Sequence, residues 1–416
     1  MALNHSCKAI LGVIAMFGFL AAVSPDAHAQ RSDSAPPPSI DAATGKTMNE
    51  AIELLNMDDL TGARAKLGTL KMDRLSPYER SRVEQMLFQI SYQEEKYEEG
   101  RQHLMNAISA GGLNESEVLQ NRYYVAQLYM QEENWVKGAE ALEEWFKAAP
   151  EPNSAAYYML AIAYYQQNEI DKALAPAKKA VELTDKPQSA WIDLLVFLYI
   201  DQENYKAALP LLEKATAMEP KKRNNWMQLS SIYQQLEMYP EALASMQLAY
   251  EAGLLTQDSD FRRLADMLAF NEVPYRCAQV LEAGLKDTTV KADADAYQKL
   301  ANCWIAAREF DKSLDPLEEA AAASDDGDLY VRLAEVNMQR EAWDAVIAAA
   351  RKAIDKGKLK DPGYPQLLTG IALYNDKKLE DARQWFERAQ KSDKHRKLAG
   401  AYMQRIKSEL NQKTGG

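Results

Sequence analysis

Apolar and small residues recur along most of this chain with a period of about 35 residues. In each copy an aromatic or large aliphatic anchor is followed by a small residue three positions later and by apolar positions four and seven further on. Upstream of each anchor, apolar residues at three- and four-residue spacing predict a first helix, and the anchor opens a second one. A period of this length is typical of an all-α solenoid. The clear copies open at Tyr97, Trp135, Ile170, Tyr205, Tyr239, Phe310, Trp343 and Leu379.

Small residues occupy the positions where the two helices of a pair cross, as Ala161 and Ala173 do, and allow close backbone approach. This arrangement resembles the tetratricopeptide repeat, whose pattern is Trp/Leu/Gly/Tyr in the first helix and Ala/Phe/Ala/Pro in the second. The resemblance covers residues 44–393 and implies a right-handed superhelical solenoid of about ten helix pairs. One copy matches the pattern closely through Trp226, Leu229, Ser230, Tyr233, Ala242, Met246 and Ala249.

Two copies and the C-terminal segment depart from the pattern. The first copy, at Leu60, is degenerate, as terminal repeats often are because one face meets water. The seventh, at Pro274, is degenerate as well. Residues 394–416 are predicted to form a capping helix and tail, with Leu398, Tyr402, Ile406 and Leu410 on one side. The solenoid itself is predicted to span residues 47–393.

The N-terminus predicts export. Lys8 precedes an apolar stretch over residues 9–23, and the motif Ala27-His28-Ala29 follows, so residues 1–29 are interpreted as a signal peptide cleaved before Gln30. The apolar stretch is shorter than the ~20 residues that span a bilayer, which disfavours an uncleaved anchor. Residues 30–46 are polar and proline-rich and are predicted to be a flexible lead segment. In a bacterium, the mature chain would then lie in the periplasm or outside the cell.

The composition narrows the classes of partner. The formal net charge is −12, which argues against nucleic acid and disfavours an anionic membrane surface. No later segment is apolar enough to predict stable membrane insertion after cleavage. The stronger explanation of this charge is a solvated acidic surface that keeps the array soluble.

The sequence does not predict an enzyme, a cofactor or a metal site. The mature chain has two distant histidines, His103 and His395, and no nucleophile motif or phosphate-binding loop. Cys277 and Cys303 occupy positions that small or apolar residues fill in other copies, so both can be buried free thiols. In an oxidising compartment they can also form a disulfide, because they lie on consecutive predicted helices. The sequence leaves both alternatives open.

Recognition is the remaining chemistry. In the tetratricopeptide family the first helices line the concave surface, and the register places a row rich in Tyr, Gln and Met there. Such side chains suit an extended or helical peptide, although packing inside a tight superhelix is the alternative. The carboxylate clamp of chaperone-binding members is absent, since those positions hold residues such as Tyr123, Asp193 and Met227. The candidate groove residues are Gln85, Gln89, Tyr92, Tyr123, Gln127, Met130, Tyr158, Ile162, Tyr165, Gln166, Phe197 and Met227.

A narrower resemblance covers residues 39–90, which are similar to exported tetratricopeptide proteins that accompany TonB–ExbB–ExbD systems in Gram-negative bacteria. It implies a non-enzymatic periplasmic scaffold with TonB, ExbB, ExbD or an outer-membrane receptor component as partner. Two alternatives remain: a scaffold for outer-membrane protein assembly or exopolysaccharide export, and a non-catalytic subunit of a cell-wall enzyme complex.

Overall fold

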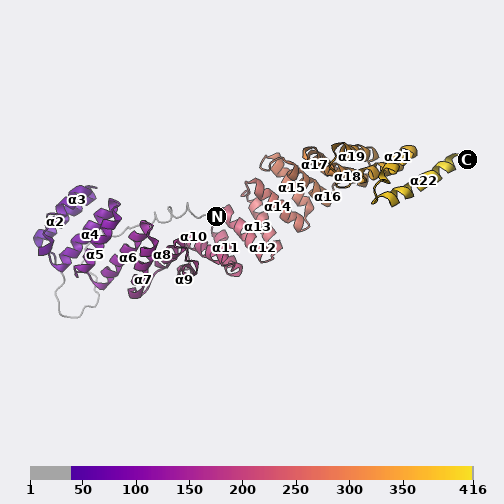
Figure 1. Ribbon diagram of the computed structural model, residues 1–416. Coiled ribbons are helices and arrows are strands. Elements are labelled where there is room, and N and C mark those ends of the chain that lie inside the picture. The colour runs from indigo at the N-terminus through magenta and orange to yellow at the C-terminus, as the bar shows by residue number, and fades with distance from the viewer. Residues whose placement is uncertain (1–38, 415–416) are drawn as a thin grey trace. The chain divides into compact units, whose positions relative to one another are not determined.

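The computed structural model describes residues 39–414, and this part of the chain contains helices and no strands (Figure 1). The signal-peptide interpretation of residues 1–29 and most of the lead segment lie outside the described residues. No described helix is long and apolar enough to cross a membrane. A short 3₁₀ helix, η1 (Met72–Arg74), precedes α4.

The α-helices follow one another with short connections. Their bounds are α2 (Ala42–Asn56), α3 (Leu60–Leu67), α4 (Pro77–Gln93), α5 (Tyr97–Ser109), α6 (Glu115–Gln131), α7 (Trp135–Ala148), α8 (Ser154–Gln166), α9 (Ile170–Glu182), α10 (Ser189–Asp201), α11 (Tyr205–Met218), α12 (Arg223–Gln235), α13 (Tyr239–Glu251), α14 (Asp258–Phe270), α15 (Pro274–Lys286), α16 (Ala294–Ala306), α17 (Phe310–Ala323), α18 (Asp328–Gln339), α19 (Trp343–Lys356), α20 (Tyr364–Asn375), α21 (Leu379–Ala389) and α22 (Arg396–Thr414).

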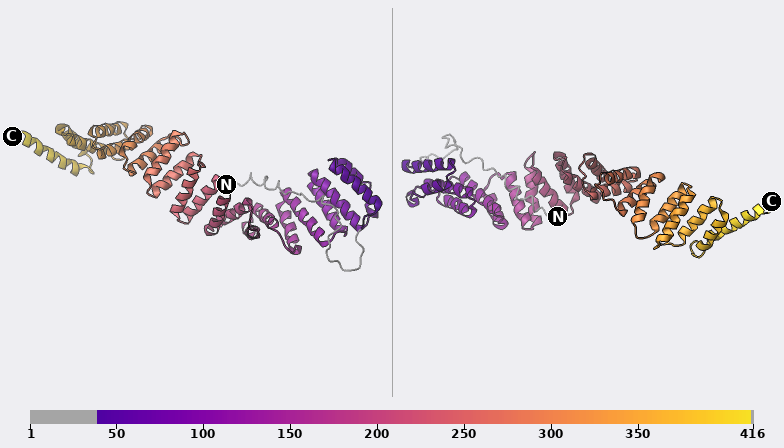
Figure 2. Two further views of the ribbon diagram at one scale, coloured as in Figure 1. Left: turned by 180° about the vertical axis from the view of Figure 1, so that it is seen from behind. Right: turned by 90° about the horizontal axis from the view of Figure 1, so that it is seen from above.

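The chain divides into two compact units, Met1–Met218 and Glu219–Gly416. In the first unit α2 packs on α3, and the pairs α4–α5, α6–α7, α8–α9 and α10–α11 follow. The second unit repeats this order from α12–α13 to α20–α21, and α22 packs on α21 (Figure 2). Each unit is therefore a stack of helix pairs, so the predicted all-α solenoid is confirmed.

The sequence period locates the second helices accurately. Every anchor of a clear copy, from Tyr97 to Leu379, is the first residue of a helix, and Leu60 and Pro274 open α3 and α15 in the two degenerate copies. The predicted boundary at residue 47 is wrong, because α2 already begins at Ala42. The Asp41 side chain accepts a hydrogen bond from the Ala43 backbone N–H at 3.0 Å and so caps the helix earlier.

One residue with left-handed backbone geometry joins the two helices of each pair, two positions before the anchor. At Glu95, for example, φ is 58°, and the next residue, Lys96, donates its backbone N–H to the Ser91 carbonyl at 2.8 Å. Such turns satisfy carbonyls at helix C-termini, but non-glycine residues adopt them at a cost. The positions are Asp58, Glu95, Glu133, Asn168, Glu203, Glu237, Glu272, Arg308, Glu341 and Lys377.

Replacing Glu133 with glycine should therefore stabilise the first unit by about 0.5–1 kcal/mol, after the greater flexibility of glycine in the unfolded chain is included. Glu133 is exposed at φ 58°, so the substitution removes no packing. Thermal unfolding of the purified variant measures the gain. The matched control, Glu140→Gly at an exposed position inside α7, should lose about 0.5–1 kcal/mol. Equal losses in both variants would contradict the prediction.

Small residues bring the helices of a pair together as expected. Ala161 of α8 and Ala173 of α9 have no exposed surface. In the last pair, a Cβ added at Gly370 would lie 2.8 Å from the ring of the fully buried Phe386, so only glycine leaves room for this ring. The core is thus a succession of contacts between neighbouring helices, as in other solenoids.

The two cysteines of the array are joined. Cys277 of α15 and Cys303 of α16 form a disulfide, with their Cα atoms 5.8 Å apart and both side chains buried. The bridge links the second helix of one pair to the first helix of the next. Of the two alternatives left open by the sequence, the structure has the disulfide.

Candidate functional site

The candidate groove residues lie on the first helices, but the structure buries part of the row. The partly exposed members are Gln89, Tyr92, Tyr123, Tyr165, Gln166 and Phe197 in the first unit and Met227 in the second. The buried members are Gln85, Gln127, Met130, Tyr158 and Ile162. The prediction that these five face a groove is wrong for the structure as it stands.

Neighbouring first helices explain this burial, because their side chains contact one another along the stack. The Gln85 amide donates to Asn121 Oδ1 at 3.1 Å, and the Tyr158 ring lies 5.8 Å from Trp191. Met130 of α6 is fully buried because its thioether covers Gly138 of α7, which has no Cβ to exclude it. Packing within a helix pair accounts for the burial of Met130, and packing between neighbouring first helices accounts for that of Gln85 and Tyr158.

Two features of the row still suit recognition. Tyr165 packs edge-on against Phe197 at 5.3 Å, and both remain partly exposed. Within the described residues, Gln127 Oε1 is buried without a hydrogen-bond partner. An unsatisfied amide at this depth favours any partner that supplies a donor. Tyr123 packs on Trp145, and burial raises its pKa to about 12, so its phenol stays neutral.

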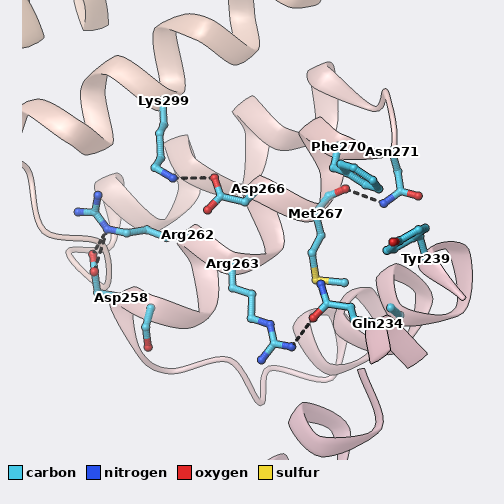
Figure 3. Close-up of a pocket in the computed structure, with 12 residues that line it drawn as sticks. Gln234, Tyr239, Asp258, Arg262, Arg263, Asp266, Met267, Phe270, Asn271 and Lys299 are labelled. Atoms are coloured by element: carbon cyan, nitrogen blue, oxygen red, sulfur yellow. Dashed lines mark hydrogen bonds and ion pairs between the residues drawn. The ribbon is translucent and has the colours of Figure 1, made fainter. Parts of the chain in front are cut away.

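The second unit contains a pocket of about 710 Å³ on α12, α13, α14 and α16 (Figure 3). One side is aromatic: the rings of Tyr239 and Phe270 are 5.1 Å apart, and 39% and 66% of these residues are exposed. Met267 lies between this aromatic pair and Arg263 in Figure 3. The residues that line the pocket are Gln234, Tyr239, Ala242, Asp258, Ser259, Arg262, Arg263, Asp266, Met267, Phe270, Asn271 and Lys299.

Two adjacent arginines of this pocket differ in their partners. Arg262 is committed to carboxylates, with Asp258 at 2.8 Å, Asp295 at 2.6 Å and Asp293 at 3.1 Å. Arg263 instead donates to two neutral oxygens, Ser231 Oγ at 3.0 Å and Gln234 Oε1 at 2.8 Å.

No ion pair of Arg263 is formed within the described part of the chain. Burial lowers the pKa of Arg263, which the negative charge of Asp260 partly opposes. The guanidinium nevertheless stays charged near neutral pH, because its ordinary pKa lies far above that range. The pocket therefore offers an uncompensated cation, partly removed from water, beside exposed aromatic surface.

A second groove, of about 780 Å³, runs over α16, α18, α20 and α22. Ile305, Met338, Ile371 and Leu398 give it an apolar floor, and Arg332 and Glu335 pair across 3.0 Å at its side. In the described chain, no group of three or more His, Cys, Asp or Glu residues is placed to hold a metal ion.

Neither site is among the predicted groove residues, because those residues lie on the first helices of the second to sixth copies. The sequence does not single out Arg263, because both arginines have aspartates at helical spacing: Asp258 and Asp266 lie four positions from Arg262, and Asp260 and Asp266 lie three positions from Arg263.

Comparison with known proteins gives a family for part of the chain. Residues 125–190 match the family model of the tetratricopeptide repeat. No curated protein matches the sequence.

Several solved structures are similar at low identity. A tetratricopeptide repeat protein from Parabacteroides merdae is 14% identical over 61% of this chain and 98% of its own, with a TM-score of 0.34. YrrB, described as a TPR protein with an unusual peptide-binding site, is 19% identical over 48% of this chain and 97% of its own, with a TM-score of 0.35. The TPR2AB domain of yeast Sti1, solved in complex with pHSP90, is 13% identical over 61% of this chain and 98% of its own, with a TM-score of 0.31. The family match covers residues 125–190, from α6 to the start of α10, so this part of the first unit is similar to the tetratricopeptide repeat.

Proposed function

We propose that this chain is an exported, non-enzymatic scaffold that binds an extended segment of a partner protein. The observation that carries the proposal is the pocket at Arg263, where an unpaired guanidinium lies beside the exposed rings of Tyr239 and Phe270. A segment with an apolar side chain next to an acidic or amide side chain would satisfy both surfaces. Stacked helix pairs commonly provide such extended binding surfaces.

Export is the second part of the proposal. It is supported by the composition of residues 1–29 and by the disulfide between Cys277 and Cys303, which persists in oxidising compartments. The periplasm of a Gram-negative bacterium is the compartment that we propose. Mass spectrometry of an osmotic-shock fraction should find an N-terminus at Gln30, whereas an intact Met1 in the inner membrane would refute export.

The proposed partners are components of a TonB–ExbB–ExbD system, on the resemblance of residues 39–90. Outer-membrane protein assembly, exopolysaccharide export and a cell-wall enzyme complex are the alternatives. Crosslinking in intact cells, with a photoreactive residue in place of Phe270, would identify the captured protein and so separate these alternatives. Capture of an assembly, export or cell-wall component, instead of TonB, ExbB or ExbD, would support the corresponding alternative.

Substitution of Arg263 or Phe270 by alanine should weaken binding of the captured partner about thirtyfold, because truncation of a central anchor commonly costs 2 kcal/mol or more. Both side chains are partly or largely exposed, so the thermal unfolding midpoint should change little. Titration of the purified variants against the captured partner measures the affinity.

Arg276→Ala and Leu248→Ala are matched controls, because both residues are exposed and neither lines the pocket. Tyr158→Ala provides the contrast in the first unit: it should lower stability through the lost contact with Trp191 and leave capture unchanged. Unaltered affinity in both pocket variants would refute the proposed binding site at Arg263. Lost affinity in the Tyr158 variant would show that the partner binds the first unit instead.

A further inference from the structure

The charge of this chain is unevenly distributed. Although the whole sequence is acidic, its C-terminal end carries exposed cations on the end of α21, on α22 and on the connection between them. Asp393 and Glu409 are the acids among residues 388–411. The exposed cations are Arg388, Lys391, Lys394, Arg396, Lys397, Arg405 and Lys407.

Helix α22 separates its apolar and basic residues onto opposite faces. Ala399 and Ile406 have no exposed surface, and Tyr402 stacks on Phe386 at 4.8 Å, so this face packs on the preceding pair. At 3.6 residues per turn, Lys397 lies directly opposite Ile406, and Arg405 and Lys407 flank it. The acid of the helix, Glu409, lies near the packed face and accepts a hydrogen bond from the Tyr374 hydroxyl.

Most of these cations are not compensated by the protein. In the described part of the chain Lys397, Arg405 and Lys407 take part in no ion pair, although Arg405 lies 6.0 Å from the Tyr402 ring centroid. By contrast, Arg396 pairs with Asp393, and Lys394 reaches Asp361 at 3.4 Å. The outward face of α22, defined here by Lys397, Arg405 and Lys407, is therefore purely cationic.

The chemistry of this face fits a lipid surface better than a protein. The residues next to Lys397 on this face, Ala401, Gln404 and Ser408, are small or polar, whereas the centre of a protein interface is apolar. The exposed Leu398 lies at the edge of the face, beside Arg405, where it lines the second groove. A cluster of lysine and arginine on a helix is typical of binding to anionic headgroups. At about 0.1 M salt the Debye length is about 10 Å, so the acidic residues of more distant repeats do not cancel this local attraction.

We propose that the outward face of α22 adsorbs the protein onto membranes that contain anionic phospholipid, through electrostatic contact with headgroup phosphates and without insertion. The net charge of −12 predicts that the protein avoids anionic membranes, but net charge does not show where the individual charges lie. This inference is independent of the pocket at Arg263.

The test is co-sedimentation of the purified protein with vesicles of phosphatidylglycerol and phosphatidylcholine, compared with pure phosphatidylcholine. Binding should require phosphatidylglycerol and should be lost at 0.5 M salt, where the Debye length is about 4 Å. The attraction grows with the number of basic residues near the surface, so reversal of all three charges in Lys397→Glu/Arg405→Glu/Lys407→Glu should weaken binding by about tenfold or more. The corresponding glutamine triple variant should lose less.

The matched control reverses three exposed lysines of the first unit, in Lys179→Glu/Lys206→Glu/Lys214→Glu, and so has the same net charge. It should bind vesicles nearly as well as the unaltered protein. Equal losses in both triple variants, or equal binding to pure phosphatidylcholine, would overturn the proposal. Vesicle binding that fails while low-salt sedimentation shows self-association through α22 would overturn it as well and would assign the face to a second copy.

Discussion

Replacing Phe386 with alanine should destabilise the second unit by about 3–5 kcal/mol, the range for a large aromatic side chain removed from a core. Phe386 is fully buried between Gly370 of α20 and the Tyr402 ring of α22, on which it stacks. Neither neighbour can fill the resulting cavity easily, because Gly370 has no side chain and Tyr402 is held by its own helix.

Urea unfolding followed by circular dichroism measures the loss, and hydrogen exchange locates it. Exchange should rise mainly in α20, α21 and α22, since each pair of a solenoid contacts only its neighbours. The control is Phe270→Ala, the same substitution at a largely exposed ring, which should change the stability by about 0.5 kcal/mol or less. A uniform rise in exchange over the first unit would show a single cooperative domain instead.

Removal of the disulfide should cost the second unit about 3–4 kcal/mol in the chain-entropy description of a loop of this length. The double variant Cys277→Ala/Cys303→Ala isolates this effect, because alanine occupies the corresponding buried position in other copies, as at Ala173.

Unfolding of the unaltered protein with and without a reductant provides the comparison. The reduced protein and the double variant should unfold at similar, lower urea concentrations, and the reductant should not affect the double variant. Identical curves for the oxidised protein and the double variant would show that the bridge adds no stability.

The sequence was sufficient for the helices because their determinants are local. The anchors Tyr97 to Leu379 open helices as predicted, since each follows a polar turn and faces the first helix of its own pair. The same reasoning did not reveal the left-handed residue two positions earlier. Glutamate occupies most of these sites, so composition does not mark them as glycine would.

The site was less predictable because it depends on contacts between helices. Met130 and Gln85 have the helical register of groove residues, yet Gly138 and Asn121 of neighbouring helices take up their side chains. Likewise, Arg262 and Arg263 are indistinguishable in the sequence. The structure distinguishes them, because Arg262 pairs with Asp258 and also with Asp293 and Asp295, about thirty residues away, whereas Arg263 forms no ion pair within the described residues.

The bridge between α15 and α16 also determines how the second unit behaves under tension. If a load is applied along the chain, helix pairs unravel and release backbone, but the segment from Cys277 to Cys303 stays closed because its ends are covalently joined. At about 3.5 Å per extended residue, the oxidised chain yields about 90 Å less length than the reduced one. In an oxidising compartment the array would therefore have a limited extension, with one inextensible joint in the middle of its C-terminal half.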